Sequence, residues 1–185
     1  MAYDIYEHVH RLAAWAASRA ASTRVSRFSV LEGQAVLAEC GFASVLKNGF
    51  GGLPSPEKMD AAHRQWRAKV IVAAAKKGLI WSHGTSAKLI NVYFKVAFVG
   101  LHGHEDPRVG ALHPPVDRLL LSELIEKDPL NKILWRRLRN RGWSNFDSSE
   151  YEEAIAGMRT ALGPSIPFWR IEEWWRGYQG NVREE

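Results

Sequence analysis

The sequence predicts an all-α protein that forms one compact domain over residues 1–185. Apolar residues recur at helical spacing through most of the chain. No stretch alternates apolar and polar residues with the β-branched enrichment that is typical of strands. The length is sufficient to close one hydrophobic core, and no linker is long enough to divide the chain.

The periodicity predicts helices over residues 3–21, 28–40, 56–77, 87–99, 115–126, 130–141, 149–162 and 167–178. Glycines follow several of the predicted ends, and Pro56 and Pro115 stand where predicted helices begin, as is usual for these residue types. Ser149 and Glu152 have the spacing of a capping box. Residues 100–114, rich in histidine and glycine, form the longest irregular stretch, which we expect to be either functional or a plain connection.

Composition limits the class of protein. The 46% of apolar and 24% of charged residues are ordinary globular values and exclude a disordered chain. Cys40 is the single cysteine, so neither an internal disulfide nor a cysteine-rich zinc site is possible. No apolar run has the length of a membrane span, and the first residues are too polar and acidic for a signal peptide. We therefore expect a cytoplasmic protein without a membrane partner.

The net charge of +5 is concentrated in one predicted helix. Residues 127–141 contain six lysines and arginines and one carboxylate, so this segment accounts for the whole excess. We expect Leu130, Ile133, Leu134 and Leu138 to form one face of the helix, and Lys132, Arg136 and Arg139 another. Such a face can contact phosphates of duplex DNA, although an ordinary solvated helix has the same pattern.

The segment 83–98 predicts a helix in the centre of the domain. Apolar side chains cover nearly its whole circumference, and its strongly polar residues are Lys88, Asn91 and Lys95, which share one stripe. Burial of an ammonium group costs several kcal/mol unless it is paired or opens on solvent. The stripe should therefore face a cleft or a carboxylate. Asp117, in the first turn of a later helix, is either that carboxylate or an N-terminal cap.

These residues resemble the helix-hairpin-helix DNA glycosylase superfamily. A glycine-containing hairpin leads into a helix with a lysine near its start, and Pro115-Val116-Asp117 opens a later helix. The resemblance covers residues 79–124 and implies that residues 100–111 are an insertion. It implies a hairpin that binds duplex DNA through the backbone amides of His83, Gly84, Thr85 and Ser86.

The resemblance also implies a chemistry. Lys88 would be the nucleophile, Asp117 would assist it, and a base would leave the DNA stack before excision. A second alignment frame puts Ser86 at the nucleophile position, as in a monofunctional member. We expect Asn91, Lys95, Phe168 and Trp169 to contact the substrate, with no cofactor.

Two other functions stay open. The first is a non-catalytic helical module for nucleic acid or a protein partner, in which Lys88 and Asp117 form a structural ion pair. The second is a metal-dependent hydrolase, because imidazoles and carboxylates are zinc ligands. Its candidate ligands lie in or beside the irregular stretch: His102, His104, Glu105, Asp106 and His113, completed by His63 or His83.

Overall fold

A computed structural model describes residues 3–177, apart from the side chains of Leu101 and His102. Its regular elements are all helical, as the sequence predicts. The α-helices are α1 (Ile5–Ala21), α2 (Val30–Glu39), α3 (Phe42–Lys47), α4 (Met59–Ala75), α5 (His83–Phe94), α6 (Pro107–Gly110), α7 (Arg118–Lys127), α8 (Lys132–Arg141) and α9 (Ser148–Leu162). Shorter or tighter helical segments are η1 (Gly49–Gly52), η2 (Pro56–Lys58), η3 (Lys95–Gly103), η4 (Pro129–Asn131), η5 (Trp143–Asn145) and η6 (Phe168–Trp174).

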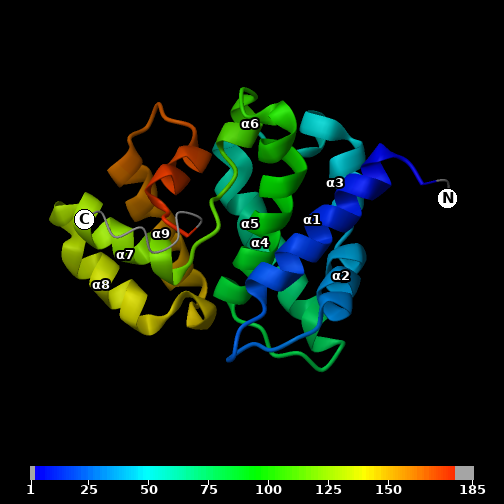
Figure 1. The fold of residues 1–185 in the computed structure, drawn as a ribbon, viewed down its shortest axis with the longest axis horizontal. Helices are drawn as coiled ribbons and strands as arrows, with labels where there is room; N and C mark the ends of the chain where they lie inside the picture. The colour runs from blue at the N-terminus through cyan, green and yellow to red at the C-terminus, as the bar shows by residue number, and fades with distance from the viewer. Residues whose placement is uncertain (1–2, 178–185) are drawn as a thin grey trace, which may run out of the picture.

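The helices form two groups that meet at α5 (Figure 1). Helices α1 to α5 enclose one hydrophobic cluster, and α7, α8, α9 and η6 enclose a second. Helix α5 takes part in both, since Leu89, Ile90 and Tyr93 belong to the first cluster and Ala87 to the second. The predicted central position of this helix is confirmed, and polar residues on its second face lie where the groups meet.

Side-chain caps explain where several helices begin. Ser29 and Glu32 form a capping box at α2, and Asp147 and Glu150 form one at α9. The prediction of a capping box from Ser149 and Glu152 is therefore wrong by two residues. Asp147 is the residue whose backbone is extended, whereas Ser149 already lies within the helix.

The predicted hairpin before the central helix is absent. Ser82 caps α5, because its hydroxyl accepts a hydrogen bond from the Thr85 amide over 3.0 Å. His83, Gly84, Thr85 and Ser86 therefore form the first turn of α5 instead of a hairpin. A Cβ atom on Gly84 would lie 1.7 Å from the carbonyl oxygen of Trp143, so this glycine permits close packing of α5 against η5.

The predicted irregular stretch is largely helical. Helix α5 continues through η3, which has π-helical hydrogen bonding, and α6 follows one short turn later. The chain is therefore extended mainly over residues 112–117, and this connection carries His113 and Asp117 across the junction between the two groups.

Two other elements differ from the prediction. Helix α3 was not predicted, and η6 is a 3-10 helix instead of an α-helix. Tyr178, the last residue of the helix predicted there, lies outside the described residues.

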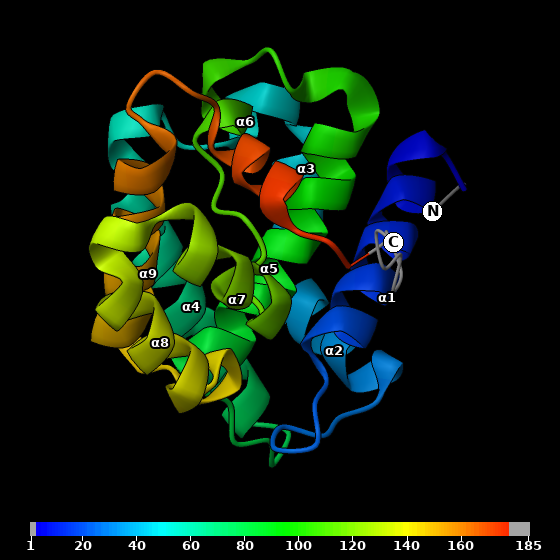
Figure 2. The same cartoon turned by 60° about the vertical axis from the view of Figure 1, so that its left-hand side comes forward.

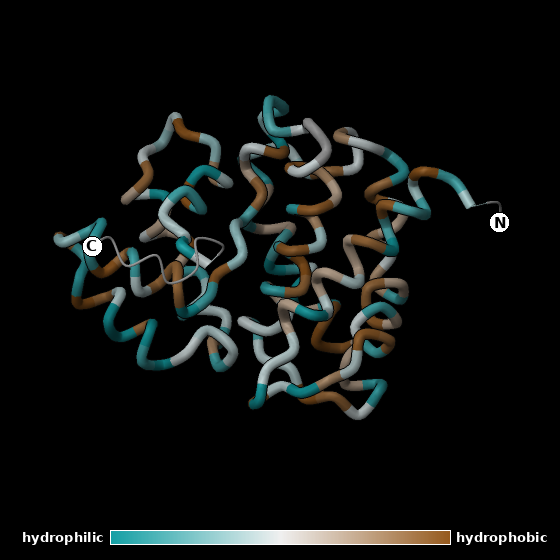
Figure 3. The backbone as a smooth tube through the Cα atoms, in the orientation of Figure 1, coloured by the Kyte–Doolittle hydropathy of each residue, from teal (hydrophilic) through white to brown (hydrophobic). Residues whose placement is uncertain are grey.

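Helix α8 is amphipathic, but its buried face differs from the predicted one. Trp135 and Leu138 are fully buried, whereas Leu130 and Ile133 are 94% and 85% exposed. Leu130 lies in η4, before α8 begins, and this shifts the pattern. The C-terminal half of α8 is drawn largely in the hydrophilic colour in Figure 3. Among the described residues, none of the helices combines the length and apolar character that crossing a bilayer requires.

Candidate functional site

Lys88 and Asp117 meet at the junction between the two groups of helices. The Lys88 Nζ atom lies 3.0 Å from Asp117 Oδ2, and their side chains are 8% and 20% exposed. Lys88 projects from the second turn of α5, and Asp117 lies at the start of α7. The predicted pairing across 29 positions of sequence is therefore present.

The two sequence-based interpretations of Asp117 apply together. Its Oδ1 atom accepts hydrogen bonds from the Leu120 amide over 2.9 Å and from the Trp175 indole over 3.2 Å. Its Oδ2 atom contacts Lys88. Asp117 is thus the N-terminal cap of α7 and the partner of the amine, one oxygen for each role. The cap and the indole hold Oδ1, which leaves Oδ2 for Lys88.

A cavity of about 430 Å³ opens beside this pair. In the view of Figure 2, the C-terminal segment, in red, is drawn above α5 and α7. Val92 and Val96 form the apolar side of the cavity, and Ala20 of α1 closes one end. The volume is within the range of small-molecule and cofactor sites.

A second ion pair, between Lys95 and Glu172, lines the same cavity. Lys95 lies two turns after Lys88 and its side chain is 39% exposed, whereas that of Glu172 is 13% exposed. The prediction that Lys95 faces a cleft is confirmed. Glu172 was not predicted, and an acidic residue within the aromatic C-terminal segment was the one signal that could have indicated it.

The aromatic walls of the cavity are Trp143 and Trp175. The Lys88 amine lies 5.6 Å from the centre of the Trp143 ring, and the Lys95 amine lies 5.9 Å from that of Trp175. Phe168 and Trp169, which we expected here, do not line this cavity. Phe168 packs within the second hydrophobic cluster, and the Trp169 ring packs edge-on against His104, because η6 turns these rings away.

Burial changes the acid-base properties of this site. Desolvation lowers the pKa of the Lys88 ammonium below its ordinary value, and the Asp117 carboxylate opposes this shift. Desolvation also raises the pKa of Glu172, against the effects of Lys95 and Lys88. Both shifts favour the neutral forms of the groups. The site thus contains an amine that loses its proton more easily, and a carboxyl group that keeps one more easily, than the same groups in water.

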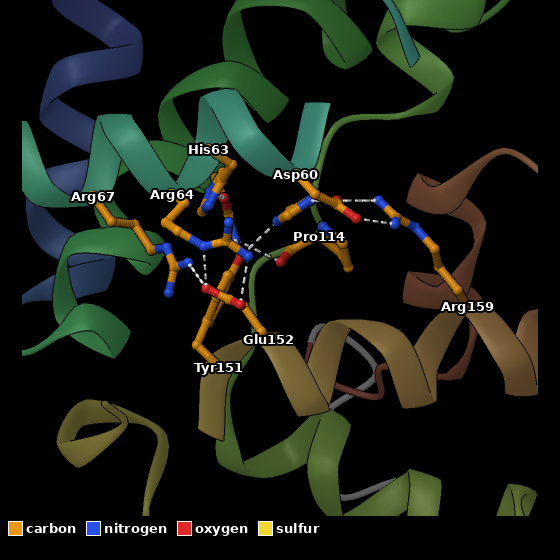
Figure 4. Close-up of polar contacts among 10 residues, drawn as sticks. Asp60, His63, Arg64, Arg67, Pro114, Tyr151, Glu152 and Arg159 are labelled. Carbon is orange, nitrogen blue, oxygen red and sulfur yellow. Dashed lines mark hydrogen bonds and ion pairs between the residues drawn. The ribbon is translucent and has the colours of Figure 1, made fainter. Parts of the chain in front are cut away.

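Asn91 does not line the cavity, contrary to the prediction, and its side chain belongs to a buried polar network instead. Figure 4 shows this network, in which α4, α5, α9 and the connection through Pro114 converge. The Asn91 amide donates to the Pro114 carbonyl over 2.8 Å and to the Tyr151 hydroxyl over 3.0 Å. Its Oδ1 atom lies 2.7 Å from His63 Nε2. Asn91 therefore joins the helix of Lys88 to the connection that carries Asp117.

The network ends in charged groups on two sides, exposed on one and buried on the other. His113 lies 3.0 Å from the Tyr151 hydroxyl and 2.8 Å from Asp60, and Arg159 forms two hydrogen bonds to that carboxylate. These contacts hold the pKa of Asp60 far below its ordinary value. On the other side, Arg67 lies over the Tyr151 ring at 4.4 Å and is nearly fully buried.

The rings of His63 and His113 stack within the network. Desolvation lowers the pKa of both histidines, so these rings are neutral near pH 7.

The candidate metal ligands do not gather at one place. His113 contacts Asp60 and Tyr151, and Asp106 caps α6. His104 packs against Trp169, and the side chain of His102 lies outside the described residues. Within the described part of the chain, no group of three or more histidine, cysteine, aspartate or glutamate residues is placed to hold a metal ion. Of the described candidate ligands, His63 and His113 lie together, with ring centres 4.2 Å apart.

The first turn of α5 has no free backbone amides at the three positions after His83. The Gly84 amide donates to Phe146 O, the Thr85 amide to Ser82 Oγ and the Ser86 amide to Ser82 O. Gly84, Thr85 and Ser86 are buried, and His83 is half-buried. The amides of Gly84, Thr85 and Ser86 are therefore not free to hold DNA, because Phe146 and Ser82 already accept their hydrogen bonds.

The basic helix is exposed, and several of its cations have carboxylate partners. Arg137 pairs with Glu153, and Lys132 lies 3.8 Å from Glu126. Arg136 is exposed, and Arg139 is half-buried with a hydrogen bond to the neighbouring Asn140 side chain. Among the described residues, Arg136 and Arg139 are therefore the cations of α8 without a carboxylate partner. Both belong to the predicted DNA-binding set.

Searches against protein-family models, curated proteins and solved structures found no match to the chain.

Proposed function

We propose that the protein is a DNA N-glycosylase with lyase activity, in which Lys88 is the nucleophile and Asp117 assists it. One observation carries the proposal: a buried amine lies 3.0 Å from a fixed carboxylate on the wall of an open cavity. The resemblance to helix-hairpin-helix glycosylases depends on the same two residues and on Pro115-Val116 before Asp117.

The cavity is suited to a nucleoside that has left the DNA stack. A base inside a duplex is out of reach, so an enzyme that excises it must receive it in a pocket with apolar or aromatic walls. Trp143 and Trp175 supply flat rings, and Val92 and Val96 supply an apolar floor. Stacking on such rings contributes about 1–3 kcal/mol per base, which offsets part of the cost of unstacking.

The proposed reaction begins at the ion pair. Lys88 transfers one proton to Asp117, and the free amine attacks C1′ of the sugar. The bond between C1′ and the base nitrogen breaks, and its electron pair leaves with the base. Because burial already lowers the pKa of Lys88, the amine needs less free energy to lose its proton. The low exposure of the pair also strengthens the interaction of Asp117 with the positive charge that develops on the sugar.

The covalent intermediate would then permit strand cleavage. A second proton of the Lys88 amine moves to the ring oxygen, the sugar ring opens, and an iminium forms between Lys88 Nζ and C1′. Loss of a proton from C2′ then breaks the C3′–O bond and releases the 3′ phosphate. Borohydride reduces such an iminium to a stable amine, and this makes the lysine detectable.

Duplex DNA is the proposed partner, and two cations of α8 supply the contact that the absent hairpin cannot. Arg136 and Arg139 can bind phosphates without reading sequence. Leu130 and Ile133, which are nearly fully exposed beside them, add an apolar edge. Apolar side chains of this kind enter between base steps in proteins that distort DNA.

Borohydride trapping on a duplex with one abasic site tests the proposal. We expect a covalent adduct with the wild-type protein and none with Lys88→Ala. Lys76→Ala is the matched control, because Lys76 also pairs with a carboxylate, Glu39, at 2.8 Å but on the surface. An adduct that persists in Lys88→Ala, or that the wild type does not form, would contradict the assignment.

A non-catalytic nucleic-acid-binding module is the second candidate. It is favoured by the hydrogen bonds that Asp117 accepts from the Leu120 amide at the start of α7 and from the Trp175 indole, since a structural ion pair would have the same surroundings. In that case the wild type would bind duplex DNA and form no borohydride adduct.

A further inference from the structure

We propose that Glu172 is the general acid that protonates the departing base. This inference rests on the proposed function and adds a second catalytic residue to the same site. Lys88 and Asp117 do not supply a proton to the base. Protonation of the base nitrogen makes the base a stable leaving group, and this step needs a further residue.

The two ion pairs divide the cavity into two ends. Lys88 and Lys95 are seven residues apart on one continuous helical segment, which corresponds to about 10 Å along its axis. If C1′ of the sugar lies at Lys88 and Asp117, the attached heterocycle extends along the cavity toward Lys95 and Glu172. The Trp143 ring lies beside Lys88 at the sugar end. The Trp175 ring lies beside Lys95, and its indole donates to Asp117, so this ring joins the two ends.

Glu172 is turned into this cavity by the fold of η6. Ile171 before it is fully buried in the second hydrophobic cluster, whereas Glu173 after it is 68% exposed and pairs with Arg170. The Glu172 side chain is 13% exposed and contacts Lys95. This difference between adjacent glutamates makes Glu173 a natural control.

The charges around Glu172 suit a proton donor. Lys95 of η3, Lys88 of α5 and Asp117 before α7 are the charged groups that act on it. Burial raises its pKa, Asp117 acts in the same direction, and the two lysines oppose them. A protonated carboxyl group can therefore persist closer to neutral pH than on an exposed glutamate.

The step balances in atoms and charge. The C1′–N bond breaks while the bond from Lys88 Nζ to C1′ forms, and the electron pair of the broken bond goes to the base nitrogen. The proton of the Glu172 carboxyl group moves to the base, which leaves as a neutral molecule. The resulting Glu172 carboxylate is stabilised by the Lys95 ammonium group already in contact with it.

Comparison of excision with trapping tests this role, because an abasic site has no base to protonate. The probes are an abasic duplex and duplexes that carry uracil, hypoxanthine, 8-oxoguanine or 3-methyladenine. For the base that the wild type excises fastest, Glu172→Gln should slow excision about 10²–10⁴-fold, and its adduct yield with the abasic duplex should fall far less. Glu173→Gln should match the wild type in both assays.

The pH dependence separates a catalytic acid from a structural group. The wild-type excision rate should fall as Glu172 loses its proton at higher pH, and this fall should be absent from the residual rate of Glu172→Gln. Lys95→Gln provides an independent variant. Because Lys95 opposes the rise in the pKa of Glu172, its removal should move the fall in rate to higher pH.

Each failure has its own signature. A wild-type adduct together with undiminished excision by Glu172→Gln would overturn the role of Glu172 alone. Equal losses of excision and trapping in a folded Glu172→Gln protein would also overturn it. If the wild type forms no adduct with the abasic duplex, the proposed function fails and this inference fails with it.

Discussion

The side-chain amide of Asn91 donates a hydrogen bond to the carbonyl oxygen of Pro114 over 2.8 Å. Asn91 lies three residues after Lys88, and Pro114 lies three residues before Asp117. One buried hydrogen bond thus ties the helix that carries the amine to the connection that carries the carboxylate. The separation of the proposed nucleophile from its partner is therefore set by the polar network of Figure 4 as well as by their own contact.

Asn91→Ala should weaken both the fold and the site. The substitution removes the partners of Pro114 O and His63 Nε2, and each buried polar group left unpaired costs about 1–3 kcal/mol. We expect a lower free energy of unfolding in urea and a lower kcat for base excision in the protein that remains folded. Asn140→Ala on the surface of α8 is the control for stability. An unchanged denaturation midpoint for Asn91→Ala would contradict the network's structural role.

The two roles of Asp117 can be separated by substitution. Asp117→Asn keeps a side-chain oxygen for the Leu120 amide, whereas Asp117→Ala removes the cap and should cost about 1 kcal/mol more in unfolding free energy. Both variants lose the carboxylate that faces Lys88, so both should lose base excision. Thermal unfolding and an excision assay measure the two effects. Retained excision in Asp117→Asn would show that the charge is dispensable.

The buried histidines predict that stability falls in mild acid. His63 and His113 are neutral in the fold, because burial lowers the pKa of each below 6.5. Below about pH 6.5 the unfolded chain binds protons that the folded chain does not. The unfolding free energy should then decrease with falling pH by about 1 kcal/mol per pH unit for each histidine, until the folded pKa is reached.

Denaturant titrations between pH 5 and pH 7.5 measure this slope. His113→Gln should reduce it, and a substitution of exposed His8 should leave it unchanged. A slope that is the same in His113→Gln and in the wild type would show that His113 does not remain neutral in the fold.

Arg136 and Arg139 of α8 predict a salt-dependent contact with DNA. Arg136→Ala and Arg139→Ala should weaken binding to duplexes of any sequence and each reduce the slope of log K against log salt by about 1. Arg11→Ala is the control, since Arg11 pairs with Glu7 on α1 in the other group of helices. An unchanged slope in both α8 variants would place the DNA contact elsewhere.

The periodicity of the sequence was sufficient to predict most of the helices but not to predict where they begin and end. The start of α5 depends on the Ser82 cap and on the close approach of Gly84 to Trp143, a contact across about 60 residues of sequence that no local pattern contains. The predicted hairpin is replaced by the first turn of α5 because of this tertiary contact. Likewise Leu130 and Ile133 have helical spacing but are exposed, because the adjacent Trp135 fills the core at α8.

The sequence by itself determined the all-helical fold and the central helix. It also predicted Asp117 as one candidate partner of Lys88, because a buried ammonium on an apolar helix needs a carboxylate or an opening to solvent. Only the tertiary structure decided which residues complete the cavity. Trp143, Glu172 and Trp175 reach it from segments that follow α8 and α9, and their positions depend on how the second group of helices packs against α5. Spacing along the chain predicts neighbours within one helix, whereas packing between helices determines which distant side chains meet.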